Sequence, residues 1–196
     1  MSQGRIEDQL SYPQRLALLK NPKTPVHVSL QHIQFLYLFD LVSLCMQPVI
    51  PQEVKQAAEE RIVAQIPKMP IGQKITLARR ASPRIVTHLL NGENLQVIHA
   101  GLDNPYLTEN ILFQSLNRPA CSQKVVESIA THKKWSTRYE LRLALLRHPH
   151  LSIAQALKFI PELKRTDIRE LAQDSRVNTF VRQYLKTTFL RPSSGE

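Results

Sequence analysis

Seven cations are the side chains of this chain most able to bind a ligand, and they form two clusters. In chain order they are Arg79, Arg80, Arg84, Lys133, Lys134, Arg138 and Arg142. Residues 118–147 contain seven Lys and Arg but only two acidic side chains. Arg138 and Arg142 are spaced one helical turn apart, so with the preceding lysines their charges can converge as phosphate contacts require. The competing interpretation is a solvated basic face that binds nothing.

The overall charge favours the same class of ligand. The chain has 26 Lys and Arg against 16 Asp and Glu, a net charge of +10. Such an excess favours polyanions or acidic proteins as partners. We expect nucleic acid or a ribonucleoprotein slightly ahead of an acidic protein surface.

Aromatic residues that could stack on bases are few near the second cluster. Trp135 and Tyr139 lie beside it in the sequence, and Tyr106 follows Asn104-Pro105. Trp135 occupies the place that Leu151 takes in a recurring pattern of helix, loop and helix. We therefore expect Trp135 to pack between helices rather than to stack on a base.

Residues that could support catalysis or hold a metal do not assemble in the sequence. His148-Pro149-His150 and His132 lack the Cys, Asp or Glu pattern that would complete a tetrahedral site. No Gly-rich phosphate loop, nucleophile elbow or His-Glu-x-x-His motif is present. We expect a non-enzymatic protein without cofactor or metal, in which His148 caps the end of a helix.

The cysteines and the hydropathy indicate the cellular compartment in which the protein is expected. Cys45 and Cys121 have no metal-like spacing, so buried thiols in a reducing compartment are expected. No run of about 18 apolar residues exists, and the first residues lack the apolar core of a secretory signal. We expect a cytoplasmic protein without a membrane segment, with a monomer as the expected state.

An internal duplication organises the chain. Residues 15–59 align with residues 142–186 without a gap, beginning with Arg-Leu-Ala-Leu-Leu in both segments. Each segment keeps an arginine and, 25 positions later, an aspartate, namely Arg15 with Asp40 and Arg142 with Asp167. The aspartates are interpreted as N-caps of the apolar runs that follow them. An ion pair with the arginine is the alternative, or an addition.

The rest of the chain repeats a pattern of short helix, Asn-Pro or similar stop, capping residue and second helix. Thr24, Thr108, Ser136, Ser152 and Asn178 are predicted caps. The pattern predicts about eleven or twelve short helices and no sheet, in one domain over residues 11–190. Prolines and a glycine in residues 65–74 suggest a hinge. Residues 1–10 and 191–196 are expected to be flexible.

Three segments resemble bacterial HEAT-like or leucine-rich-repeat-variant proteins. They are Leu-Leu-Lys-Asn-Pro-Lys-Thr-Pro at 18–25, Leu-Asp-Asn-Pro-Tyr-Leu-Thr at 102–108 and Leu-Leu-Arg-His-Pro-His-Leu-Ser at 145–152. The resemblance implies a right-handed α-solenoid, a HEAT-like superhelix of stacked helix pairs. Some HEAT-like proteins are DNA glycosylases for alkylated bases, and Glu140 beside Trp135 and Tyr139 is the only grouping that could serve that chemistry. We keep this activity as a remote alternative to a binding scaffold.

Overall fold

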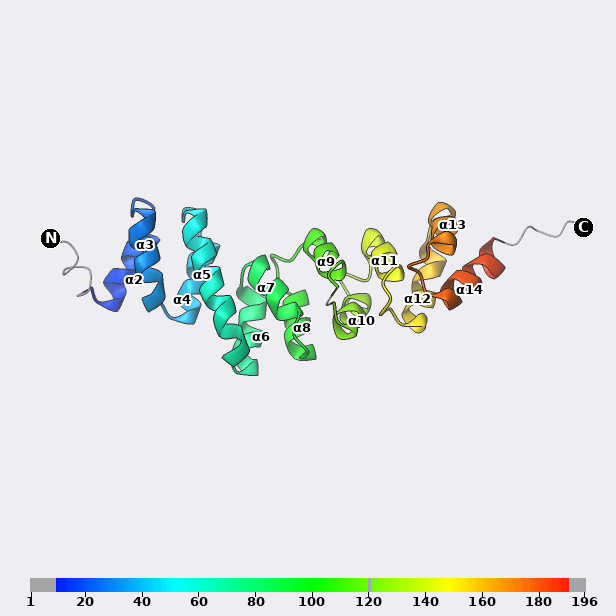
Figure 1. Ribbon diagram of the computed structural model, residues 1–196, viewed down its shortest axis with the longest axis horizontal. Coiled ribbons are helices and arrows are strands. Elements are labelled where there is room, and N and C mark those ends of the chain that lie inside the picture. The colour runs from blue at the N-terminus through cyan, green and yellow to red at the C-terminus, as the bar shows by residue number, and fades with distance from the viewer. Residues whose placement is uncertain (1–9, 120, 191–196) are drawn as a thin grey trace, which may run out of the picture. The chain divides into compact units, whose positions relative to one another are not determined.

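The computed structural model describes residues 10–119 and 121–190, and these residues are helical (Figure 1). They form 13 α-helices and no β-strand, which confirms the all-α class. In the part of the chain so described, no helix combines the length and apolar character needed to cross a bilayer. The segments expected to be flexible, apart from Leu10, lie outside the described residues.

The chain divides into two compact units. Unit 1 runs to Leu89 and includes Asp103–Tyr106, whereas unit 2 comprises Leu90–Leu102 and continues from Leu107. The expected single domain over residues 11–190 stays a prediction.

Unit 1 contains six α-helices and two short 3-10 helices. They are α2 (Tyr12–Lys20), α3 (Val26–His32), η1 (Ile33–Phe35), α4 (Leu38–Met46), α5 (Gln52–Gln65), η2 (Ile66–Lys68), α6 (Ile71–Arg80) and α7 (Pro83–Leu90). Helix α2 packs on α3 and α4, and α5 packs on the same two helices. Fully buried residues such as Leu41, Leu44 and Ile62 belong to the core of this unit.

Unit 2 contains seven α-helices and one short 3-10 helix among the described residues. Its elements are α8 (Leu95–Leu102), α9 (Glu109–Leu116), α10 (Gln123–Thr131), α11 (Tyr139–Leu146), α12 (Ile153–Phe159), η3 (Ile160–Glu162), α13 (Arg165–Gln173) and α14 (Thr179–Phe189). Helix α8 packs on α10, and α9 packs on α11. Figure 1 shows α9, α11 and α13 on one side of unit 2, with α8, α10, α12 and α14 on the other.

The two aligned segments fold into the same elements. The shift from Tyr12 to Tyr139 is 127 residues, and the same shift carries α3, η1 and α4 onto α12, η3 and α13 with identical bounds. It also carries the first residue of α5 onto the first residue of α14. We call α2–α5 the first copy and α11–α14 the second copy.

Both copies contain the same partly buried hydrogen-bond network, and it corrects the expected role of the aspartates. The Tyr12 hydroxyl donates to Asp40, and the Tyr139 hydroxyl donates to Asp167. Each tyrosine oxygen also accepts a backbone N–H, from Tyr37 at 3.1 Å in the first copy and from Lys164 at 2.9 Å in the second.

The aspartates are therefore neither N-caps nor ion-pair partners of the arginines. Tyr37 and Lys164 are the N-cap residues of α4 and α13, which places Asp40 and Asp167 in the first helical turn. The expectation failed because the sequence places both helix starts three residues late, and because a tyrosine 28 residues upstream cannot be recognised as a partner from local spacing. The pKa of both tyrosines is raised, first by burial and then by the bond to the aspartate.

The other predicted helix starts are partly right. Thr108, Ser152 and Asn178 are N-cap residues, and the last two accept a backbone N–H with their side chains. Thr24 is not a cap, because Pro25 precedes the first residue of α3 and the Thr24 hydroxyl donates to the Leu18 carbonyl at 2.6 Å. Ser136 was also predicted wrongly, since α11 begins at Tyr139 after Arg138.

The proposed hinge segment is more regular than its prolines and glycine suggest. Only Met69 and Pro70 lie between η2 and α6, and Gly72 lies in the first turn of α6. A Cβ atom at Gly72 would have no neighbour within 4 Å, so packing does not require glycine there. A hinge in residues 65–74 stays a prediction.

Candidate anion-binding site

The second basic cluster lies on a loop that its own hydrogen bonds hold in place. Between α10 and α11, the His132 carbonyl accepts the backbone N–H of Trp135 at 3.2 Å and of Ser136 at 2.9 Å. The His132 Nδ1 atom accepts the N–H of Lys134 at 3.2 Å, and Arg138 N donates to the Trp135 carbonyl at 3.1 Å. These hydrogen bonds constrain the backbone of the loop from which the three cations project.

Trp135 anchors this loop to the core, as the sequence predicted. Its side chain is 2% exposed, and its indole Nε1 donates to the Leu102 carbonyl at 2.8 Å. A buried tryptophan whose N–H already has a partner is committed to packing and is not available to stack on a base. The Lys134 Nζ atom lies 4.0 Å from the centroid of the Trp135 ring, a cation–π contact that places the ammonium at the surface above the anchor.

Lys134 and Arg138 converge on one cavity of about 360 Å³, which we call the basic cavity. Its lining residues are Leu107, Thr108, Glu109, Lys134, Trp135 and Arg138. Thr108 and Glu109 mark the start of α9, where backbone N–H groups and the helix dipole favour an anion. The cavity thus joins two side-chain cations to the positive end of a helix.

The Glu109 carboxylate partly neutralises the positive charge of the basic cavity. Its Oε1 atom lies 3.3 Å from Arg138 Nε, and the two side chains are 38% and 54% exposed. An ion pair that is so exposed contributes roughly 0 to 1 kcal/mol, so an incoming phosphate can replace the carboxylate at small cost. Glu109 is therefore an internal competitor for any anion at Arg138.

The other two members of the second cluster are placed differently. Lys133 is exposed but does not line the basic cavity. The Arg142 side chain is only 12% exposed, and its guanidinium pairs with Glu162, bonds the Ser136 carbonyl and lies 5.6 Å from the Phe159 ring centroid. Arg142 therefore supports the packing of the second copy, and the expected convergence of Arg138 and Arg142 on one helical face is not seen.

The first cluster lies where α6 ends and α7 begins, within unit 1. Arg79 and Arg80 are exposed in the last turn of α6, where a cation is favoured by the helix dipole. Neither makes an ion pair with a described residue. Arg84 is engaged instead, with Glu59 and Glu60 at 3.5 Å each. Glu59 is itself buried and accepts a hydrogen bond from the Ser82 hydroxyl.

Three further cations next to the first cluster were missed. Residues 61–92 contain six Lys and Arg and no Asp or Glu, and the members not predicted are Arg61, Lys68 and Lys74. Lys68 is exposed and Lys74 is half-buried, whereas Arg61 donates to the Gln34 carbonyl. A running count of charge along the chain would have found this stretch, because its signal is the absence of acids rather than the density of bases.

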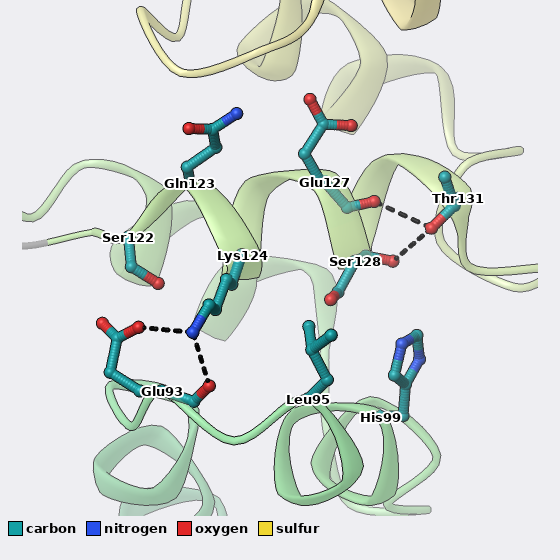
Figure 2. Close-up of a pocket in the computed structure, with 9 residues that line it drawn as sticks. All are labelled: Glu93, Leu95, His99, Ser122, Gln123, Lys124, Glu127, Ser128 and Thr131. Carbon is teal, nitrogen blue, oxygen red and sulfur yellow. Dashed lines mark hydrogen bonds and ion pairs between the residues drawn. The ribbon is translucent and has the colours of Figure 1, made fainter.

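A second cavity of unit 2 contains no free cation of the predicted clusters. It has a volume of about 630 Å³ and lies between α8 and α10 (Figure 2). Lys124 Nζ reaches the Glu93 carboxylate at 2.9 Å and the Glu93 carbonyl at 3.1 Å, so its charge is already neutralised. Glu127, also in the lining, accepts the N–H of Ser152 at 2.9 Å. The cavity contains none of the seven predicted cations and offers an anion no unpaired positive charge.

The histidines and cysteines serve the fold. His148 Nδ1 accepts the N–H of His150 at 3.2 Å, and burial, followed by the neighbouring His150, lowers the pKa of His148. Asn104 takes the same role in unit 1, accepting the Tyr106 N–H at 2.8 Å. Both cysteines are buried free thiols, as predicted, and burial raises the pKa of the Cys45 thiol to about 12. Among the residues described, no three His, Cys, Asp or Glu side chains are placed to hold a metal.

Glu140, Trp135 and Tyr139, the residues considered for DNA glycosylase chemistry, do not form one site in the structure. Trp135 is buried, and the Tyr139 hydroxyl is bonded to Asp167. Glu140 lines a separate cavity with Arg147 and Arg176. The carboxylate and the aromatic rings therefore do not face one shared space.

Comparisons with protein-family models, curated proteins and solved structures gave no match to this chain. The assignment of function therefore depends on the geometry and charge of the chain itself.

Proposed function

We propose that the chain is a non-enzymatic, cytoplasmic and monomeric binding scaffold that engages the phosphates of a nucleic acid or ribonucleoprotein. The observation that carries the proposal is the convergence of Lys134 and Arg138 on the start of α9 in one cavity. The exposed Lys133 and the unpaired Arg79 and Arg80 extend the contact within their respective units. Arg84 and Arg142 then act in support, because carboxylates already neutralise them.

The architecture that we propose for this scaffold is a right-handed, HEAT-like α-solenoid over residues 11–190. It is supported by the alternation of helices between two sides of unit 2 (Figure 1) and by the identical bounds of α3, η1 and α4 with α12, η3 and α13. In such an array each helix pair buries its apolar face only against its neighbours, which suits helices as short as seven to eleven residues.

The test is a titration of a fluorescent single-stranded RNA with the protein at several salt concentrations, read by anisotropy. Affinity should fall steeply with salt, and the Lys134→Ala/Arg138→Ala variant should lower the slope of log K against log salt by about 1 to 2. The matched control is Lys20→Ala/Lys23→Ala, which removes the same charge from exposed residues of unit 1 outside the clusters. If the two variants lost equal RNA affinity, the binding would depend on net charge alone, and the proposed site would be wrong.

Glu109 provides a second, opposite test. Glu109→Gln should raise RNA affinity, because it frees Arg138 and removes a negative charge from the start of α9. Glu140→Gln removes the same charge from an exposed position that lines another cavity. Equal gains in both variants, or no gain at Glu109, would contradict a phosphate site in the basic cavity.

The rival function is a protein-interaction scaffold that binds an acidic protein. It predicts no salt-sensitive RNA affinity and a specific partner that remains bound in a pulldown after nuclease treatment. The same titration and a nuclease-treated pulldown therefore separate the two functions.

A further inference from the structure

The duplication allows the last helix of the second copy to be compared with its counterpart in the first. Lys186 and Phe189 of α14 correspond to Glu59 and Ile62 of α5. Glu59 is 8% exposed and Ile62 is fully buried, whereas Phe189 is 43% exposed and Lys186 is also exposed. Positions that are covered in the first copy are therefore open in the second.

The residues that follow α6 contact Glu59 in the first copy. The Ser82 hydroxyl, directly before α7, donates to Glu59, and Arg84 in the first turn of α7 lies 3.5 Å from the same carboxylate. Figure 1 shows α6 and α7 following α5 in unit 1, whereas α14 is the last labelled helix of unit 2. A helix thus occupies this side of α5, and no described element takes that place beside α14.

Helix α13 shows the same contrast. Val42 in α4 is 6% exposed and Leu38 is half-buried, but their counterparts Arg169 and Arg165 are both exposed. These two arginines line a cavity of about 180 Å³ together with Phe189. Apolar side chains in the first copy have become cations around an exposed aromatic ring in the second.

A buried atom on the same side of α14 lacks a partner. Arg182 corresponds to Lys55, one turn before the position of Lys186, and its Nε atom is buried without a hydrogen-bond partner among the described residues. Such an atom is costly unless a further group bonds it. We call Arg165, Arg169, Arg182, Lys186 and Phe189 the open face.

The acids nearest in sequence to the open face are already engaged. Asp167 accepts the Tyr139 hydroxyl, and Asp174 is paired with Arg147 and Arg176. Glu170 lies 3.8 Å from Arg147. The four cations of the open face therefore have no carboxylate partner among the described residues.

We propose that the open face binds an acidic amphipathic helix of a partner protein, in the place that α7 takes beside α5 in the first copy. Because Lys186 stands where the first copy has Glu59, the incoming helix carries a carboxylate where α7 carries Arg84. Further carboxylates face Arg165 and Arg169, and an apolar side chain packs on Phe189 in the cavity. A second copy of this chain is the poorer occupant, because its net charge of +10 opposes self-association through a basic face.

The probe is a helix-stapled 14-residue peptide with leucines at i, i+4 and i+7 and glutamates on both flanks. Fluorescence anisotropy with the full chain should show saturable binding that Phe189→Ser and Lys186→Glu each weaken at least tenfold. Lys158→Glu makes the same charge change on α12, where the residue lines a different cavity, and should weaken binding at most threefold. Unaltered circular dichroism should accompany each variant.

Reversing the charges on the open face and on the peptide provides the most discriminating experiment. The Arg169→Glu/Lys186→Glu variant should lose the acidic peptide and gain the peptide in which lysines replace the glutamates. Failure of the wild-type chain to bind the acidic peptide, or binding unaffected by both Phe189→Ser and Lys186→Glu, would overturn the proposal.

Two other results would show that the open face binds a different partner, and either would overturn the proposal. One is a dimer in sedimentation that Phe189→Ser disperses, which would identify a second copy. The other is a loss of RNA affinity in Phe189→Ser as large as the loss of peptide affinity, which would identify nucleic acid. Because the RNA titration of the Lys134→Ala/Arg138→Ala variant addresses other residues, either proposal can fail while the other holds.

Discussion

The two copies share the bounds of three elements and the first residues of the other two, but different side chains stabilise these elements. In the first copy the Arg15 guanidinium lies 4.0 Å from the Phe35 ring centroid and 3.3 Å from His32 Nδ1. In the second copy the corresponding Arg142 meets a carboxylate at the position of Phe35 and an aromatic ring at the position of His32. The backbone arrangement is therefore compatible with several sets of contacts.

The tyrosine–aspartate network occurs at equivalent positions in the two copies. Even there, the residue that covers the tyrosine ring differs. The Tyr37 ring lies 4.5 Å from the Tyr12 ring, whereas the Lys164 ammonium lies 5.1 Å from the Tyr139 ring. Helix register thus depends on the hydroxyl, the carboxylate and one backbone N–H, while the ring accepts either a stacking or a cationic neighbour.

The largest difference expected between the copies concerns one pair of leucines. Leu145 is fully buried and its counterpart Leu18 is half-buried. Leu145→Ala should lower the free energy of unfolding by about 2 to 5 kcal/mol, and Leu18→Ala by about 1 to 2 kcal/mol, because less apolar surface is lost from a partly exposed site. Urea denaturation followed by circular dichroism measures both. Equal losses would mean that the two copies are equally covered in solution.

The shared network should give equal effects in the two copies. Tyr12→Phe and Tyr139→Phe each remove one donor to a carboxylate and one acceptor of a backbone N–H, at a cost of about 1 to 2 kcal/mol. Tyr106→Phe is the control, since this residue is 50% exposed and should change stability by less than about 0.5 kcal/mol. A large effect in only one copy would show that the network supports only that copy.

Acid stability should distinguish the copies through Asp174. Hydrogen bonds from Arg176 and then Arg147 hold the pKa of Asp174 well below its usual range, and its counterpart in the first copy is Gln47. A depressed carboxylate pKa adds stability above the unfolded pKa, and that stability is lost as the pH falls through the folded pKa. Asp174→Asn should therefore destabilise the chain at pH 7, and its deficit should shrink below about pH 4.

Thermal unfolding of Asp174→Asn and wild type between pH 2 and pH 7 measures this deficit. Glu53→Gln in the first copy is the control, because Glu53 is exposed and its loss should leave the pH profile unchanged. A deficit for Asp174→Asn that stays constant down to pH 2 would rule out the ion pairs as its cause.

The smallest effect on stability is expected at Lys134, just before the second copy. Its counterpart, Glu7, lies outside the described residues. Lys134→Ala should cost at most about 1 kcal/mol, the value of an exposed cation–π contact with Trp135. Urea denaturation measures this cost, and a larger loss would make Lys134 a structural residue and weaken its assignment to ligand binding.

Several features could be predicted from the sequence because they depend on local chemistry. Thr108, Ser152 and Asn178 were recognised as caps, since a short polar side chain before an apolar run has few other roles. Trp135 was predicted to be buried because a leucine takes its place in the repeated pattern. The errors at Asp40 and Asp167 have the opposite origin, because their partner is 28 residues away.

The candidate site divides in the same way. Clustering in the sequence identified Lys134 and Arg138, which the structure brings to one cavity, but it could not separate them from Arg142. Whether a cation is free depends on a carboxylate supplied by another helix, as Glu162 is for Arg142 and Glu60 is for Arg84. The open face was missed because its cations look ordinary until their counterparts in α4 and α5 are seen to be buried or half-buried.

The sequence by itself determined the all-helical class, the duplication and the positive charge, since periodicity, self-similarity and composition are properties of the chain alone. The tertiary structure decided which residues pair across helices: tyrosine with aspartate, Arg142 with Glu162, and Arg138 with Glu109 at the start of α9. The physical reason is that charge neutralisation and burial depend on distances between segments about 20 to 30 residues apart, and these distances exist only after the helices have packed.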